Sequence, residues 1–155
     1  MVYNDDPDFD KGKTALIVVD MQNGFVEDDS FLAKMGLDNT YLKPTLGPVC
    51  KLVQACHQEG VPVIFTRYIL RPDYTDAGLM AEHQNTARDA RALVAGSRDV
   101  ELIDALGAQP DDFVVDKTRY SAFYNTSEAT FFDGSGTTDG NEADVLSYTW
   151  TLAED

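Results

Sequence analysis

The sequence predicts an α/β fold in which a parallel β-sheet is covered by helices. Three short apolar runs support this fold, at residues 14–20, 62–68 and 113–117. The runs are rich in β-branched residues and short enough for buried strands. Between the first two, residues 44–59 place apolar side chains at three- and four-residue steps, the pattern of an amphipathic helix. Helices that alternate with strands are typical of parallel sheets.

The size and composition favour one soluble globular domain. The chain has 155 residues and 43% hydrophobic residues, enough for a core of its own. No apolar run approaches the roughly 20 residues of a membrane span. The first 13 residues are acidic and polar, unlike the basic-then-apolar start of a secretory signal. We therefore predict a cytoplasmic protein that does not bind membranes.

The charge of the chain argues against polyanionic partners. Its formal net charge is −15 at pH 7. Nucleic acids and anionic membrane surfaces both require basic patches, so neither is an expected partner. Asp outnumbers Glu and Lys is scarce, which fits either a salt-adapted organism or an ordinary acidic protein.

The first apolar run, 14–20, ends in a candidate functional carboxylate. Asp20 follows five consecutive apolar residues, 15–19. Ligands of open α/β sheets bind at the carboxyl ends of the strands, so Asp20 is expected at the mouth of such a crevice. The alternative is a solvated Asp in a turn. Residues 21–25 lack the glycine spacing of a phosphate-binding loop, so no nucleotide is predicted.

The third run, 113–117, ends in a charge of the opposite sign. Lys117 closes this run as Asp20 closes the first. Since the carboxyl ends of parallel strands share one edge of a sheet, the two side chains are expected to meet there. Strand alternation directs the neighbouring Asp116 to the opposite face.

Two segments resemble a known family. VVDMQNGF at 18–25 resembles the first signature of the isochorismatase-like cysteine hydrolases. VVDKTRYSAFYNT at 114–126 is similar to their third-strand segment, and its RYSAFYNT portion looks most like the ureidoacrylate amidohydrolase branch. The resemblance implies an isochorismatase-like (Rossmann-like) three-layer fold. It also implies hydrolysis of a C–N bond in a small amide or ureido substrate, with Asp20 as general base and Lys117 as the catalytic cation.

The same reasoning gives a set of candidate substrate contacts. They lie in the first signature, at the carboxyl end of the second strand, or in the aromatic turn after the third: Gln22, Phe25, Arg67, Tyr68 and Tyr120. For Arg67 the alternative is an ion pair with one of the many surface carboxylates. No cofactor is predicted.

The cysteines and histidines favour neither a nucleophile nor a metal site. Cys50 and Cys56 fall on the apolar stripe of helix 44–59, where a free cysteine acts as a small hydrophobic residue. His57 and His83 lack the spacing of metal ligands, and the metal-binding pattern of nicotinamidases is absent. We therefore predict no metal site.

The resemblance stops near Thr126, so the family-like C-terminal half is expected to be incomplete. The predicted division is a polar lead-in (1–13), a partial hydrolase domain (14–126) and a divergent acidic tail (127–155). The segment that carries the family's nucleophilic cysteine is not in this sequence. A truncated gene, an altered reading frame and an alternative ending all fit this pattern.

Three functions follow from these observations. The first is a C–N hydrolase by descent that is inactive in this truncated form. The second is a non-catalytic fragment or regulator that keeps a small-molecule pocket or an assembly face; a homo-oligomer is left open. The third, weaker hypothesis is an isochorismate vinyl-ether hydrolase.

The tail contains one strand-like segment. Residues 145–152 alternate, with Leu146, Tyr148, Trp150 and Leu152 on one side. This period of two predicts a β-strand. We expect it to lie against the first strand, 14–20, as a substitute edge.

Overall fold

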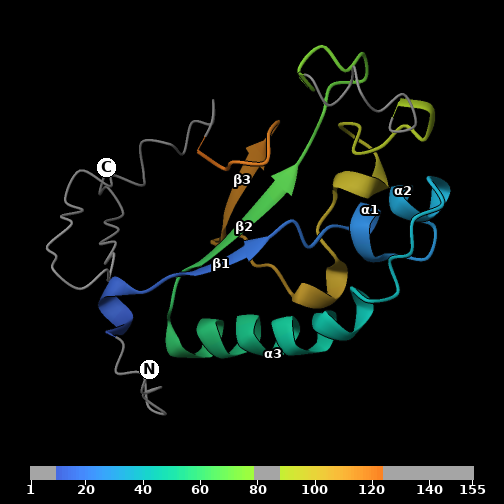
Figure 1. Ribbon diagram of the computed structural model, residues 1–155. Coiled ribbons are helices and arrows are strands. Elements are labelled where there is room, and N and C mark those ends of the chain that lie inside the picture. Colours follow the sequence, from blue (N-terminus) through green and yellow to red (C-terminus); the bar gives the residue numbers. More distant parts are fainter. Residues whose placement is uncertain (1–9, 79–87, 124–155) are drawn as a thin grey trace, which may run out of the picture.

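The computed structural model describes residues 10–78 and 88–123, and these form a parallel α/β sheet with helices (Figure 1). The sheet has three strands in the order β1-β2-β3: Leu16–Val19, Val63–Tyr68 and Phe113–Lys117. Both pairings are parallel. The predicted α/β class is confirmed, and so are the positions of the three strands.

One long helix covers one face of the sheet. Helix α3, Lys43–Glu59, runs beneath the strands in Figure 1. Pro44 is tolerated in its first turn, and Gly60 ends the helix in the left-handed conformation, at φ 69°. The buried side chain of Val53 packs with Val18 and Phe65 of the strands. The amphipathic pattern of the sequence thus produced the expected helix.

Two short helices and two 3-10 turns gather near the carboxyl ends of the strands. They are α1, α2, η2 and η3, with the bounds Asn23–Val26, Phe31–Lys34, Arg98–Val100 and Asp104–Leu106, whereas the 3-10 turn η1, Lys11–Lys13, precedes β1. A second apolar cluster forms there around Tyr68, Leu70 and Tyr74. Residues 98–106 contain two separate 3-10 turns rather than one longer helix. No helix in the described ranges is long and apolar enough to cross a membrane.

Strand β1 differs from the prediction in one respect. We expected both faces to be buried, but only Val18 is; Ile17 is 46% exposed and Val19 is 61% exposed. The reason is topological. β1 is an edge strand of the described sheet, and α3 packs only on the side of Val18.

Parts of the predicted division lie outside the described residues. Of the lead-in 1–13, only residues 10–13 are described; Asp10 caps η1, which spans the other three. The acidic tail 127–155 and its strand-like segment 145–152 lie wholly outside. The domain boundaries therefore stay predictions.

Candidate functional site

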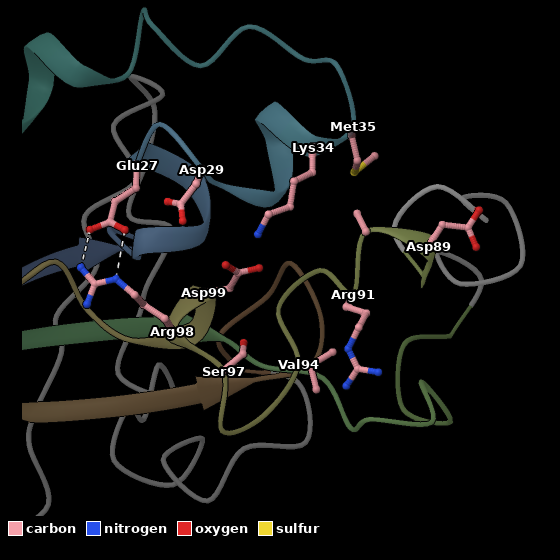
Figure 2. A pocket seen from close by; sticks show the side chains of 11 residues that line it. Glu27, Asp29, Lys34, Met35, Asp89, Arg91, Val94, Ser97, Arg98 and Asp99 are labelled. Atoms are coloured by element: carbon pink, nitrogen blue, oxygen red, sulfur yellow. Dashed lines mark hydrogen bonds and ion pairs between the residues drawn. The ribbon is translucent and has the colours of Figure 1, made fainter.

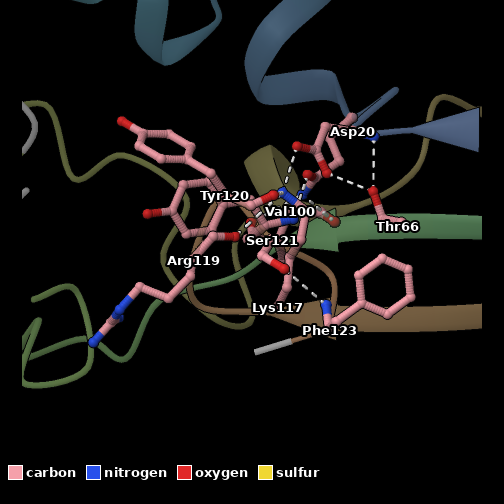
Figure 3. A network of polar contacts seen from close by, with 10 residues as sticks. Asp20, Thr66, Val100, Lys117, Arg119, Tyr120, Ser121 and Phe123 are labelled. Carbon is pink, nitrogen blue, oxygen red and sulfur yellow. Dashed lines mark hydrogen bonds and ion pairs between the residues drawn. The ribbon is translucent and has the colours of Figure 1, made fainter. Parts of the chain in front are cut away.

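Asp20 and Lys117 form an ion pair across the end of the sheet (Figure 3). Asp20 directly follows β1, and Lys117 is the last residue of β3, so the two side chains meet across β2. Lys117 Nζ donates to Asp20 Oδ2 at 2.7 Å. The Lys117 side chain is 2% exposed and that of Asp20 is 23% exposed. The expected meeting of the two charges is confirmed, whereas their catalytic roles stay predictions.

A threonine that the sequence analysis did not single out holds the carboxylate. Thr66 Oγ1 donates to Asp20 Oδ1 at 2.7 Å and accepts the Asp20 backbone N–H at 3.2 Å. Asp20 has φ 53°, in the left-handed region that Asp adopts more readily than most residues. The two carboxylate oxygens are therefore fixed by different donors, Thr66 and Lys117. The feature of the sequence that could have pointed to Thr66 is its hydroxyl group within the otherwise mostly apolar segment 62–66.

The buried ammonium of Lys117 is surrounded by acceptors. Besides Asp20, Nζ donates to the carbonyls of Arg119 and Tyr120, each at 3.3 Å. Nζ also lies 5.0 Å from the ring centroid of Tyr68, a cation–π distance. Three oxygens match the three donors of an ammonium, so this charge is held in place while almost fully buried.

Two of the predicted substrate contacts, Tyr68 and Tyr120, lie beside this pair. Their rings meet edge to face with centroids 6.0 Å apart. Tyr68 is buried, whereas Tyr120 is exposed. Burial raises the pKa of the Tyr68 hydroxyl above its ordinary value, and the neighbouring Tyr120 adds to this effect. The Tyr68 hydroxyl therefore keeps its proton to a higher pH than a solvated tyrosine does.

The raised pKa of Tyr68 predicts a loss of stability at alkaline pH. A raised folded-state pKa contributes no pH dependence below the unfolded pKa, about 10, and stability falls as pH rises from there through the folded value. We expect Tyr68→Phe to reduce the fall in urea midpoint above pH 10. The matched control is the exposed Tyr41→Phe. Equal alkaline curves for the wild type and Tyr68→Phe would contradict this assignment.

Gln22, another of the predicted substrate contacts, makes its hydrogen bonds within the fold. Its side chain is 0% exposed. Its amide nitrogen donates to the carbonyls of Tyr68 and Val100 at 3.1 and 3.0 Å, and its oxygen accepts the Tyr68 N–H at 2.7 Å. The amide thus ties β2 to the turn at Val100. This geometry favours a structural role over the predicted substrate contact.

Phe25 and Arg67 also make contacts with other side chains of the protein. The partly buried Phe25 packs edge to face on Phe31 at 5.1 Å. Arg67 forms a two-bond ion pair with Asp116, at 2.7 and 2.9 Å. Arg67 and Asp116 are paired residues of β2 and β3, one position before the pair Tyr68 and Lys117. Because successive side chains of a strand point to opposite faces, Arg67 and Asp116 lie on the other face of the sheet from Lys117. For Arg67, the alternative of a surface ion pair describes the structure better than substrate binding.

An apolar pocket adjoins the ion pair. Its volume is about 320 Å³, and its walls come from the three strands and the turn after β3: Ile17, Val19, Ile64, Thr66, Val115, Lys117 and 120–123. Thr66 and Lys117 place polar groups in otherwise apolar walls. Such a lining is typical of small-molecule sites.

A larger cavity of about 720 Å³ lies elsewhere, between the short helices and residues 89–99 (Figure 2). Charged side chains of both signs line it, and Glu27 and Arg98 pair across one side at 2.6 and 3.1 Å. Neither Asp20 nor Lys117 lines this cavity. It is therefore separate from the ion-pair site.

The two cysteines lie away from the ion pair. Cys50 and Cys56 are free and partly buried on α3, packed on the cluster that includes Val18 and Phe65. Thr66 and Lys117 line the opposite face of the sheet. In the described part of the chain, no group of three or more Cys, His, Asp or Glu residues could hold a metal ion.

The described residues thus form a parallel α/β sheet with a candidate acid–base site, in which the buried Lys117 pairs with the partly exposed Asp20 at the carboxyl ends of the strands. The Isochorismatase domain matches residues 14–139. The chain belongs to the isochorismatase family.

Two curated proteins are similar to most of this chain. The ureidoacrylate amidohydrolase RutB of Methylobacterium radiotolerans is 33% identical over 129 residues, covering 76% of this chain and 50% of that protein. RutB of Pseudomonas syringae pv. syringae is 34% identical over 128 residues, covering 75% and 52%. The chain thus spans about half the length of the curated relatives it matches.

Two solved structures share the fold. A cysteine hydrolase from Pseudomonas syringae pv. phaseolicola matches with a TM-score of 0.63 and 35% identity, over 79% of this chain and 54% of that one. The N-carbamoylsarcosine amidase from Thermoplasma acidophilum matches with a TM-score of 0.53 and 25% identity, over 75% and 58%. The predicted isochorismatase-like fold is therefore confirmed.

Proposed function

We propose that Asp20 and Lys117 are the base and the cation of a site for C–N bonds in a small amide or ureido compound. The observation that carries this proposal is the 2.7 Å ion pair, in which the ammonium is almost fully buried. An apolar pocket of suitable size for a small molecule adjoins it. The names of two relatives, a ureidoacrylate amidohydrolase and an N-carbamoylsarcosine amidase, agree with this substrate class.

The chemistry of such a site assigns a role to each charge. A thiolate attacks the carbonyl carbon, and the C–N bond breaks as the tetrahedral intermediate collapses. Asp20 would take the thiol proton and pass it to the leaving nitrogen. Lys117 would balance the negative charge of the carboxylate–thiolate pair. Thr66 and Lys117 hold the carboxylate oxygens and so limit the directions in which Asp20 exchanges a proton.

The nucleophile is the part that this chain does not place at the site. The sequence contains two cysteines, and both lie on α3, on the other side of the sheet. We propose that the chain by itself binds small amides without hydrolysing them. A non-catalytic binding protein is thus the second candidate function, favoured by a pocket that adjoins the Asp–Lys pair but neither cysteine.

We expect no hydrolysis of ureidoacrylate or N-carbamoylsarcosine above the rate in buffer. Loss of the nucleophile from such a catalytic unit typically lowers kcat by about a millionfold. The measurement is product release followed by NMR, with a full-length relative as positive control. Isochorismate in the same assay tests the third hypothesis.

Two outcomes separate the candidates. Turnover that disappears in Cys50→Ser or Cys56→Ser would overturn the assignment of both cysteines. Shifts of the Ile17 and Val19 methyl signals on adding ureidoacrylate, without turnover, would support a binding protein. If these signals do not change at millimolar ligand, the pocket beside Lys117 is not the binding site.

A further inference from the structure

Among the described residues, strand β1 lies at the edge of the sheet and has one largely exposed face. It is the first strand in the described order β1-β2-β3, so one side of its backbone has no described neighbour. On the face away from α3, the side chains of Ile17 and Val19 are about half exposed or more. Such an apolar edge is a template for an added strand, because its backbone groups are free to pair.

We propose that residues 145–152 of the same chain dock as a strand along this edge of β1. The course of the chain supports this occupant. Phe123, the last described residue, lines the same pocket as Ile17 and Val19. The chain therefore reaches its last described residue beside the exposed face of β1.

The sequence after Phe123 contains one segment suited to the role. Residues 134–140 are rich in Gly, Ser and Thr, the composition of a linker, whereas 145–152 alternate in the period of a strand. About 20 residues of linker have a root-mean-square span of roughly 25 Å, enough to cross a small sheet. Both the length and the pattern thus fit intramolecular docking.

Docking would place a specific set of side chains beside the exposed face of β1. In one of the two possible registers, Leu146, Tyr148, Trp150 and Leu152 would lie beside Ile17 and Val19, since side chains alternate between faces and a one-residue shift exchanges them. Docking in this register would remove apolar surface of Ile17 and Val19 from water. This inference goes beyond the proposed function and does not depend on it.

Trp150 is the single tryptophan of the chain, so its fluorescence reports on docking directly. In the full chain we expect emission at shorter wavelength, and weaker acrylamide quenching, than for N-acetyltryptophanamide. Val19→Glu should shift the emission to that of the free amide. The matched control is Val114→Glu, the same substitution at an exposed position on the opposite face of the sheet. The control should leave the emission unchanged.

Hydrogen exchange provides a second measurement that does not depend on a charged variant. Deleting residues 144–155 should raise amide exchange in β1 and leave exchange in α3 unchanged. Solvent-like Trp150 emission in the folded full chain, or unchanged β1 exchange after the deletion, would overturn the proposal. So would Trp150 protection that is lost on dilution together with a dimer in sedimentation, because a second copy would then be the cover.

Discussion

Asp20→Asn is expected to destabilise the protein by about 3 kcal/mol, more than Lys117→Met. Removing the counter-charge leaves an almost fully buried ammonium without its carboxylate, and loss of one member of a buried pair typically costs about 3–5 kcal/mol. Lys117→Met instead leaves a carboxylate that is partly solvated and still bonded to Thr66, so we expect about 1–2 kcal/mol. Urea denaturation of the two variants measures this asymmetry.

Asn is chosen for this variant because it avoids an additional cost from backbone strain at position 20. Asp20 has a positive φ, which Asn adopts more readily than Ala. The double variant Asp20→Asn/Lys117→Met should cost less than the sum of the two single variants, because the pair is lost only once. A larger cost for Lys117→Met than for Asp20→Asn would contradict the burial asymmetry.

Gln22→Leu is expected to cost about 3 kcal/mol or more. The substitution leaves the Tyr68 N–H and the carbonyls of Tyr68 and Val100 without the partner that the structure gives them. Each buried polar group that loses its partner costs about 1–3 kcal/mol. The measurement is again the free energy of unfolding in urea.

The matched control for this experiment is Gln54→Leu, at an exposed position of α3. Surface substitutions usually change stability by less than about 0.5 kcal/mol. If Gln22→Leu were equally mild while it abolished binding of ureidoacrylate, Gln22 would be the substrate contact that the sequence suggested.

The Asp–Lys pair itself could be predicted from the sequence. Asp20 and Lys117 each end an apolar run, and parallel strands align their carboxyl ends at one edge. That rule needs only the strand positions, which the β-branched runs gave correctly. Helix α3 could also be predicted from the sequence, because its stripe of apolar residues and the Gly60 that ends it are local signals.

Only the tertiary structure decided which of the neighbouring polar residues support the fold and which adjoin the pocket. Thr66 reaches Asp20 because the register pairs Thr66 with Val19. Gln22 turned inward to three backbone groups, and Arg67 found Asp116 on the next strand. Partners of this kind are set by register and by long-range contacts, and the same residue type can make several of them. Local periodicity therefore specified the strands and the helix, whereas the occupation of each polar side chain depended on which distant groups the fold brought within hydrogen-bonding distance.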